Sequence, residues 1–320
     1  MNCWVVSDGT AGMENQALGL AQILGFPTQV KRLQTRPPWR WLPPSLWPCP
    51  LAAQTRGGDR LEPPWPDVLI ATGRQSVAPA LAIKARNGGR TFAIQIQNPG
   101  IFRRRFDLVV APLHDQLTGP NVVSTTGSLH GITREKLAEA GRKFAPALAH
   151  LKRPLVAVLV GGTNKAFRLS PQHTRRLAQG LVSLVNRHGA GLAVTPSRRT
   201  GQDNEAVLRE ILNPLGAEIW DGKGENPYLG YLALADAIVV TGDSVNMVSE
   251  ACSTGKPVYV FDLEGGAAKF SRFHEKLRRE GFTRPFTGTL EQWTYKPLDD
   301  TARVAAIIKE RLAKWSAMNQ

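Results

Sequence analysis

Short β-branched runs that alternate with helical stretches are the feature that most constrains the fold of this chain. In the first half, strand-like runs at 3–7 and 68–73 are each followed by a turn and a helical apolar pattern. The second half repeats the alternation from the run at 155–162 onward. Strands that alternate with helices predict a parallel sheet covered by helices. We therefore predict an α/β chain with two Rossmann-like domains of parallel sheet that face each other across a cleft.

The length of 320 residues fits two domains of ordinary size. We place the boundary near residues 150–154, so that 1–150 form the N-terminal domain and 151–320 the C-terminal domain. The last helical pattern, at 300–316, carries one apolar stripe. This helix could pack onto either domain, including back onto the N-terminal one.

The net charge of +14 is shared between the halves, with +8 in residues 1–150 and +6 in residues 151–320. Such an even distribution indicates surfaces adapted to a negative partner, for which nucleic acid, anionic lipid and phosphorylated small molecules are candidates. The sequence has no helix-turn-helix, zinc-finger or RNP-type signature, so nucleic acid is not an expected partner. The oligomeric state is left open.

Cysteine and histidine spacing argues against a metal site. The three cysteines are scattered, the six histidines show no ligand spacing, and no D-x-D motif follows a predicted strand. We expect neither a metal nor a cofactor. No secretory signal and no apolar run of about 18 residues is present, which predicts a cytoplasmic or peripheral protein.

Residues 36–66 interrupt the alternation, since they hold nine of the 23 prolines and four of the eight tryptophans. Proline interrupts helices and sheets, so we predict a long irregular excursion of the N-terminal domain. Trp39, Trp41 and Trp47 lie among arginines that include Arg40. Aromatic rings beside cations are typical of segments at a membrane surface. The alternative is a loop that packs on its own domain.

Three predicted strands of the second half end in turns rich in hydrogen-bond donors. In open parallel sheets, ligands bind beyond the carboxyl ends of the strands, where helix N-termini present free N–H groups. Two consecutive glycines in the first turn would let the backbone approach a ligand closely. We expect one anion site there, made by Gly161, Gly162, Thr163, Asn164, Lys165, Arg168, Ser197, Arg198, Thr241, Gly242, Asp243 and Ser244.

Asp243 and Glu250 are seven residues apart, which on one helix would place them on one stripe, about 10.5 Å apart along the axis. A diphosphate on the N–H groups at Ser244 would then leave Glu250 within reach of a ribose. The alternatives are that Asp243 is an N-cap and that Glu250 is a solvated helix residue.

Three segments resemble known families. The sequences S-D-G-T-A-G-M-E-N-Q at 7–16, G-G-T-N-K-A-F at 161–167 and the block at 241–258 resemble bacterial relatives of the plant mitochondrial-fission "elongated mitochondria" family. The glycine-rich turns and the 241–258 block also resemble GT-B glycosyltransferases. The resemblance implies a GT-B-like fold whose second domain binds a nucleotide sugar, with Gly162, Thr163, Ser244 and Glu250 at phosphates and ribose.

On the acceptor side, an inverting sugar transfer needs a base for the acceptor hydroxyl, and Asp8 and Glu14 are the candidates. Glu14 could instead hydrogen-bond a loop N–H at a helix start. Lys165, Arg168 and Arg198 could stabilise the leaving diphosphate without a metal. Further residues expected on the acceptor side of the cleft are Gly9, Thr10, Gly12, Asn15, Gln16, Arg74, Gln97, Asn98 and His130.

Together these features predict a metal-independent inverting glycosyltransferase that moves a sugar from a nucleotide sugar to an anionic, lipid-linked acceptor. The protein would lie on the inner face of the cytoplasmic membrane. Two alternatives stay open: a nucleotide-sugar epimerase or hydrolase of the same fold, and a non-catalytic, membrane-recruited scaffold.

Overall fold

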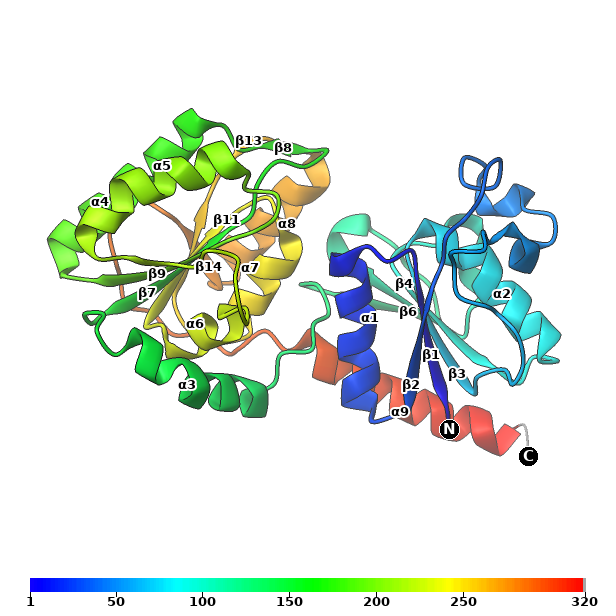
Figure 1. Cartoon of the computed structure of the whole chain (residues 1–320). Coiled ribbons are helices and arrows are strands. Elements are labelled where there is room, and N and C mark those ends of the chain that lie inside the picture. The colour runs from blue at the N-terminus through cyan, green and yellow to red at the C-terminus, as the bar shows by residue number, and fades with distance from the viewer. Residues whose placement is uncertain (319–320) are drawn as a thin grey trace. The chain divides into compact units, whose positions relative to one another are not determined.

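The computed structural model describes residues 1–318, which form two compact units (Figure 1). Unit 1 holds Met1–Gly131 together with residues 299–318, and unit 2 holds Ile132–Leu298. The division therefore falls before the helix α3 (Arg134–Leu148), not after it at 150–154 as we predicted. The physical reason is packing, since α3 lies against α6 (Tyr228–Leu234) and Leu148 belongs to a core of unit 2.

Unit 1 is built on a parallel sheet of six strands in the order β2-β1-β3-β4-β5-β6. Helix α1 (Ala11–Leu24) covers one face together with α9 (Asp300–Met318), and α2 (Val77–Arg86) covers the other. Both faces are buried, which explains the continuous apolar runs in the sequence. The strands are β1 (Cys3–Ser7), β2 (Thr28–Arg32), β3 (Val68–Thr72), β4 (Phe92–Ile96), β5 (Leu108–Pro112) and β6 (Val122–Thr125).

The last helix, α9, packs on unit 1 along α1, as Figure 1 shows in red and blue. Val304, Ile308 and Leu312 place its apolar stripe in the same core as Leu20 of α1. At its N-terminal end, the Asp300 carboxylate accepts the N–H groups of residues 126 and 127, at 2.7 and 2.9 Å. The contacts thus assign this helix to the N-terminal of the two units.

Unit 2 has a second parallel sheet, in the order β10-β9-β7-β11-β12-β14. Helices α4 and α5 cover one face, and α3, α6, α7 and α8 cover the other. A short ribbon of β8 (Phe167–Arg168) and β13 (Glu264–Gly265) lies beside the sheet. The remaining bounds are β7 (Leu155–Val160), α4 (Pro171–His188), β9 (Gly191–Pro196), α5 (Gln202–Leu212), β10 (Glu218–Ile219), β11 (Ala237–Thr241), α7 (Val245–Cys252), β12 (Val258–Phe261), α8 (Ala268–Arg279) and β14 (Thr283–Pro285).

The proline- and tryptophan-rich segment 36–66 is an irregular excursion of unit 1 with two short 3-10 turns. Trp47 is buried against Ala53 and Ala78 of α2, with Trp39 packed beside it. The expectation that Trp47 lies at a membrane surface is therefore wrong, because its ring fills a small core of its own domain. Trp41, by contrast, is 72% exposed. Among the described residues, no helix has the length and apolar character that crossing a bilayer requires.

Candidate functional site

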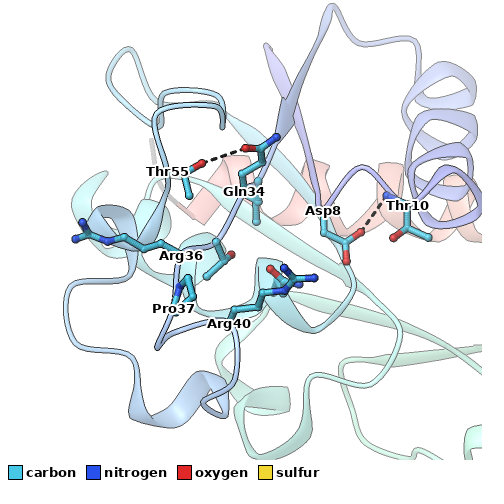
Figure 2. A pocket seen from close by; sticks show the side chains of 10 residues that line it. Asp8, Thr10, Gln34, Arg36, Pro37, Arg40 and Thr55 are labelled. Atoms are coloured by element: carbon cyan, nitrogen blue, oxygen red, sulfur yellow. Dashed lines mark hydrogen bonds between the residues drawn. The ribbon is translucent and has the colours of Figure 1, made fainter.

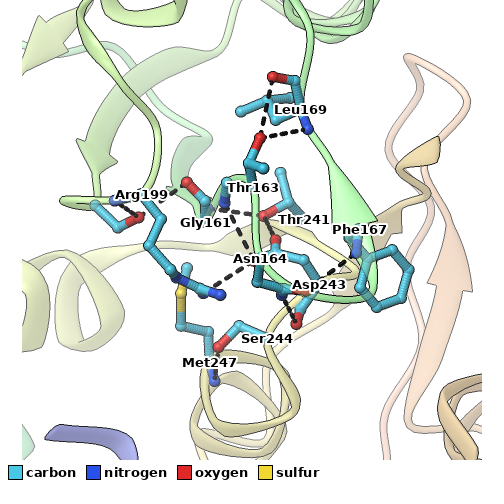
Figure 3. Close-up of polar contacts among 12 residues, drawn as sticks. Gly161, Thr163, Asn164, Phe167, Leu169, Arg199, Thr241, Asp243, Ser244 and Met247 are labelled. Carbon is cyan, nitrogen blue, oxygen red and sulfur yellow. Dashed lines mark hydrogen bonds and ion pairs between the residues drawn. The ribbon is translucent and has the colours of Figure 1, made fainter. Parts of the chain in front are cut away.

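The three donor-rich turns of unit 2 meet at one edge of the sheet, because β9, β7 and β11 are neighbours and run parallel (Figure 3). The N–H of Gly161 donates to Thr241 Oγ1 at 2.8 Å. The N–H of Thr163 donates to the carbonyl of Arg199 at 3.2 Å. The Asn164 amide donates to the carbonyl of Asp243 at 3.3 Å. The turn after β7 is thus hydrogen-bonded to both neighbouring turns.

The carboxylate of Asp243 is the centre of this network, and its side chain is fully buried. One oxygen accepts the Thr241 hydroxyl at 2.6 Å, and the other accepts the N–H of Gly162 at 3.1 Å. Arg199 reaches the same oxygen from the β9 turn, with Nη2 at 2.9 Å. Burial raises the pKa of Asp243, whereas the Thr241 hydroxyl and the Arg199 guanidinium favour its ionised form.

The two glycines after β7 make room for this network and not for a ligand. A Cβ at Gly161 would lie 2.3 Å from Asp243 Oδ1, and one at Gly162 would lie 1.9 Å from the carbonyl oxygen of Arg199. Both glycine N–H groups also donate hydrogen bonds to acceptors within the protein. The expectation that these glycines let the backbone approach a ligand closely is therefore wrong, because other atoms of the protein fill the space beside them.

Three other polar side chains of the predicted site form hydrogen bonds within the protein. The Thr163 hydroxyl accepts the N–H of Leu169 at 3.1 Å, and Asn164 Oδ1 accepts the N–H of Phe167 at 3.0 Å. The Ser197 hydroxyl donates to the Gly161 carbonyl at 2.9 Å. Among the donors predicted for this site, Lys165, Arg168 and Arg198 are exposed, and their side chains have no hydrogen-bond or ion-pair partner in the described part of the chain.

Helix α7 begins at Val245, with Ser244 as its N-cap and the Ser244 hydroxyl accepting the N–H of Met247 at 3.4 Å. Asp243 therefore lies outside the helix, and the expectations that it caps α7 or shares a helical stripe with Glu250 are wrong. Within residues 1–318, the N–H groups of Ser244 and Val245 donate to no protein acceptor. Free N–H groups at a helix N-terminus favour an anion.

Glu250 lies in the second turn of α7 and is partly buried. The Tyr228 hydroxyl, from the start of α6, donates to its Oε2 at 2.5 Å. Burial raises the pKa of Glu250 to about 7, and the Tyr228 hydrogen bond opposes that rise. Sequence reasoning missed Tyr228, since its approach depends on the packing of α6 beside α7 and leaves no local signal.

In unit 1, Glu14 forms an ion pair with Arg32 of β2. Arg32 Nη2 lies 2.8 Å from Oε1 and Arg32 Nε lies 3.0 Å from Oε2, and the Ser7 hydroxyl donates to Oε2 at 2.9 Å. These contacts, the Arg32 hydrogen bonds first, lower the pKa of Glu14. The expectation that Glu14 is a base is therefore wrong, because a carboxylate held ionised by a cation is a poor proton acceptor. Its partner is also not a loop N–H.

Asp8 follows β1 and keeps one oxygen without a protein partner in the described residues, while Oδ1 accepts the N–H of Thr10 at 3.1 Å. Asp8 lines a cavity of about 520 Å³ that lies within unit 1 (Figure 2). The cavity is mostly polar, with two arginines from the segment 36–66. Its lining residues are Asp8, Thr10, Leu33, Gln34, Thr35, Arg36, Pro37, Arg40, Thr55 and Gln75.

Most of the residues predicted on the acceptor side do not line this cavity. Arg74 Nη2 donates to the carbonyl of Arg40 at 3.0 Å, and Asn98 Oδ1 accepts the N–H of Gly100 at 2.8 Å. His130 is 4% exposed, and burial lowers its pKa. Gly9, Gly12, Asn15, Gln16 and Gln97 are likewise absent from the lining of this cavity in the described chain.

Comparison with known proteins decides the family. The model of the family described as mitochondrial fission ELM1 matches residues 11–312. The chain belongs to the mitochondrial fission ELM1 family. The resemblance that we read from the motifs is thereby confirmed. In this family member the 241–258 block runs from the end of β11 through α7 into β12, and the 161–167 motif forms the turn after β7.

Two relatives are similar over most of the chain. Mitochondrial fission protein ELM1 of Arabidopsis thaliana is 34% identical over 280 residues, which cover 78% of this chain and 65% of that protein. The alignment therefore spans a little less than two thirds of the plant protein. Uncharacterized protein RP120 of Rickettsia prowazekii (strain Madrid E) is 27% identical, with 97% of this chain and 98% of that protein covered.

Solved structures share the fold at low sequence identity. UDP-GlcNAc 2-epimerase from Methanocaldococcus jannaschii has a TM-score of 0.57 and 11% identity, covering 97% of this chain and 100% of that one. The Neisseria meningitidis UDP-GlcNAc 2-epimerase bound to UDP-GlcNAc has a TM-score of 0.51 and 13% identity, covering 98% and 100%. The glycosyltransferase SnogD from Streptomyces nogalater has a TM-score of 0.53 and 16% identity, covering 98% of this chain and 94% of that one. The predicted α/β, GT-B-like fold with two parallel sheets is confirmed.

Proposed function

We propose that this protein binds a nucleotide sugar on unit 2 and transfers the sugar to an anionic, lipid-linked acceptor. The observation that carries the proposal is the start of α7, where the N–H groups of Ser244 and Val245 have no acceptor in the described chain. They lie at the carboxyl edge of a parallel sheet, where ligands of such folds bind. The fold likeness to a structure bound to UDP-GlcNAc supports the donor class.

The donor diphosphate would lie on the first turn of α7, where the helix dipole and free N–H groups favour negative charge. Lys165 and Arg198 are exposed cations on the turns that meet there, and Arg168 is an exposed cation of β8. All three would stabilise the leaving diphosphate without a metal. Glu250 Oε1 would accept hydrogen bonds from the ribose hydroxyls, since Oε2 already accepts the Tyr228 hydroxyl. Asp243 would act as a positioning residue that fixes the turns.

Asp8 is the carboxylate that would serve as base, because its Oδ2 has no protein partner in the described chain and it lines a cavity. In an inverting transfer, Asp8 would take the proton of the acceptor hydroxyl as that oxygen bonds to the anomeric carbon. The bond from the anomeric carbon to the diphosphate oxygen would break, and the nucleoside diphosphate would leave with the electron pair.

The membrane part of the proposal rests on the segment 36–66. Trp41 is 72% exposed and directly follows Arg40, and Leu46 of the same segment is 59% exposed. An exposed ring next to cations suits the headgroup region of an anionic membrane. This exposed surface supports our proposal that the protein lies on the inner face of the cytoplasmic membrane.

A second candidate function is a nucleotide-sugar epimerase, which the fold likeness to the Methanocaldococcus jannaschii enzyme favours. An epimerase would need the donor site of unit 2 and no second substrate. Without any acceptor, formation of an epimer would identify this activity, and release of free sugar would identify a hydrolase of the same fold.

The experiment that tests the proposal is thermal unfolding of the full chain with a panel of nucleotides and nucleotide sugars. A ligand at 100 times its Kd should stabilise the protein by about 2.7 kcal/mol. Glu250→Gln should reduce this stabilisation, and an exposed control, Glu225→Gln, should not. If no nucleotide stabilises the protein, the transferase and epimerase functions are both wrong, and a scaffold related to the organelle-fission relatives is favoured.

A further inference from the structure

The cavity of unit 1 brings together charges that have no partner inside the protein. The Arg40 guanidinium makes no hydrogen bond or ion pair with any described residue, and Figure 2 shows it on the side that faces Asp8. Asp8 Oδ2 is free as well. Arg36 extends the other way, with its guanidinium carbon 4.9 Å from the centre of the Trp39 ring. Arg40 is thus the arginine that faces Asp8 across the cavity.

We propose that this cavity binds a phosphate-bearing polyol, with the phosphate at Arg40 and a hydroxyl at Asp8 Oδ2. A phosphate offers several acceptor oxygens, which match the N–H donors of a guanidinium. The carboxylate of Asp8 can only accept, so it selects a ligand that carries a hydroxyl as well. The volume of about 520 Å³ suits a small headgroup.

This inference rests on the proposed function, since it names the chemical class of the acceptor. The hydroxyl at Asp8 would be the one that receives the sugar. The ligand could be a soluble polyol phosphate or the headgroup of a lipid. Arg40 is followed directly by the exposed Trp41, which would allow a lipid headgroup to reach the cavity from a membrane surface.

Binding of sn-glycerol 3-phosphate to the full chain, measured by calorimetry, tests the inference. Arg40→Gln should weaken binding about tenfold or more, because a charge-assisted hydrogen bond is worth more than 1.4 kcal/mol. Arg86→Gln removes an exposed arginine at the C-terminal end of α2 and should change the Kd less than about twofold. Equal weakening by both substitutions would mean non-specific charge attraction and would overturn the proposal.

A further variant tests the hydroxyl contact at Asp8. Asp8→Asn should weaken binding of glycerol 3-phosphate and not of inorganic phosphate, because only the polyol phosphate carries a hydroxyl for the carboxylate. If Asp8→Asn affects both probes equally, the proposed arrangement is wrong.

Vesicles distinguish the two sources of the ligand. Binding to phosphatidylglycerol vesicles that Arg40→Gln abolishes, without binding of glycerol 3-phosphate, would identify a lipid headgroup, and the reverse result would identify a soluble ligand. Either supports the phosphate-polyol class, whereas binding of neither overturns it. Nucleotide-induced stabilisation is measured separately at unit 2, so failure here would leave the donor site standing.

Discussion

Asp243 Oδ2 lies 2.9 Å from Nη2 of Arg199 and 3.1 Å from the N–H of Gly162. One buried carboxylate thereby joins the turns that follow three neighbouring strands, β9, β7 and β11. The start of α7 follows two residues later. The position of the proposed diphosphate site therefore depends on this carboxylate, although Asp243 itself has no group left for a ligand.

Replacement of Asp243 by alanine should lower the free energy of unfolding by about 2–4 kcal/mol. The substitution leaves the Gly162 N–H and the Thr241 hydroxyl without their acceptor, and the partial exposure of Arg199 reduces the loss. Urea unfolding measures the change, with Asp203→Ala in the exposed first turn of α5 as the control. A loss for Asp243→Ala no larger than that of the control would contradict the assigned role.

Gly162→Ala should destabilise the protein more than Gly189→Ala. A Cβ at Gly162 would lie 1.9 Å from the Arg199 carbonyl oxygen, so the β9 turn would have to move. At Gly189, which ends α4 with φ of 64°, no atom lies within 4 Å, and only the backbone strain of about 1 kcal/mol remains. Thermal unfolding compares the two variants, and similar melting temperatures would count against the crowding argument.

Asp8→Asn and Glu14→Gln should separate catalysis from structure. If Asp8 is the base, Asp8→Asn should lower kcat about 10²–10⁴-fold with little change in donor affinity. Glu14→Gln should alter stability through its contact with Arg32 and leave kcat within about threefold. Steady-state kinetics on the transfer reaction gives both values. The reverse pattern, with kcat lost only in Glu14→Gln, would refute the assignment.

Donor affinity should rise with pH because the pKa of Glu250 is raised to about 7. If the carboxylate form holds the ribose, affinity for a nucleotide sugar should increase about tenfold from pH 6 to pH 8 as that group ionises. Without ligand, the same group stabilises the fold below its ordinary pKa of 4.5, and this contribution is lost as the pH rises through 7. Glu250→Gln should give a flat binding profile; a profile unchanged by the substitution would exclude Glu250.

Trp41 and Trp47 should respond differently to replacement by alanine. Trp47→Ala empties the small core against α2 and should cost about 3–5 kcal/mol of stability. Trp41→Ala changes an exposed ring and should leave stability within about 0.5 kcal/mol, while weakening binding to anionic vesicles. Sedimentation with vesicles measures the second effect, and undiminished binding of Trp41→Ala would argue against a membrane role for this segment.

The central strands of each sheet could be predicted from the sequence, because they are buried on both faces and form continuous apolar runs. The edge strand β2 could not, because its residues are partly exposed and form no apolar run. The meeting of three turns in unit 2 also followed from parallel strands. The contacts between the turns could not be predicted, since the partners of Asp243 come from positions as distant in the sequence as Gly162 and Arg199. A glycine pair in the sequence does not show whether a ligand or a carboxylate of the protein occupies the space beside it.

Partners set by tertiary packing account for the other differences. Glu14 pairs with Arg32 because β2 lies beside β1, and Trp47 is buried because the irregular segment folds back onto α2. Neither contact leaves a periodic pattern. Tyr228 likewise reaches Glu250 only because α6 and α7 cover the same face of the sheet.

Amide hydrogen exchange at the start of α7 tests the central claim most directly. The protein would be compared with and without a nucleoside diphosphate that stabilises it. Bound diphosphate should slow exchange at Ser244 and Val245, whose N–H groups have no acceptor among the described residues. Exchange that is unchanged at these two residues while the nucleotide is bound would contradict the donor site proposed for unit 2.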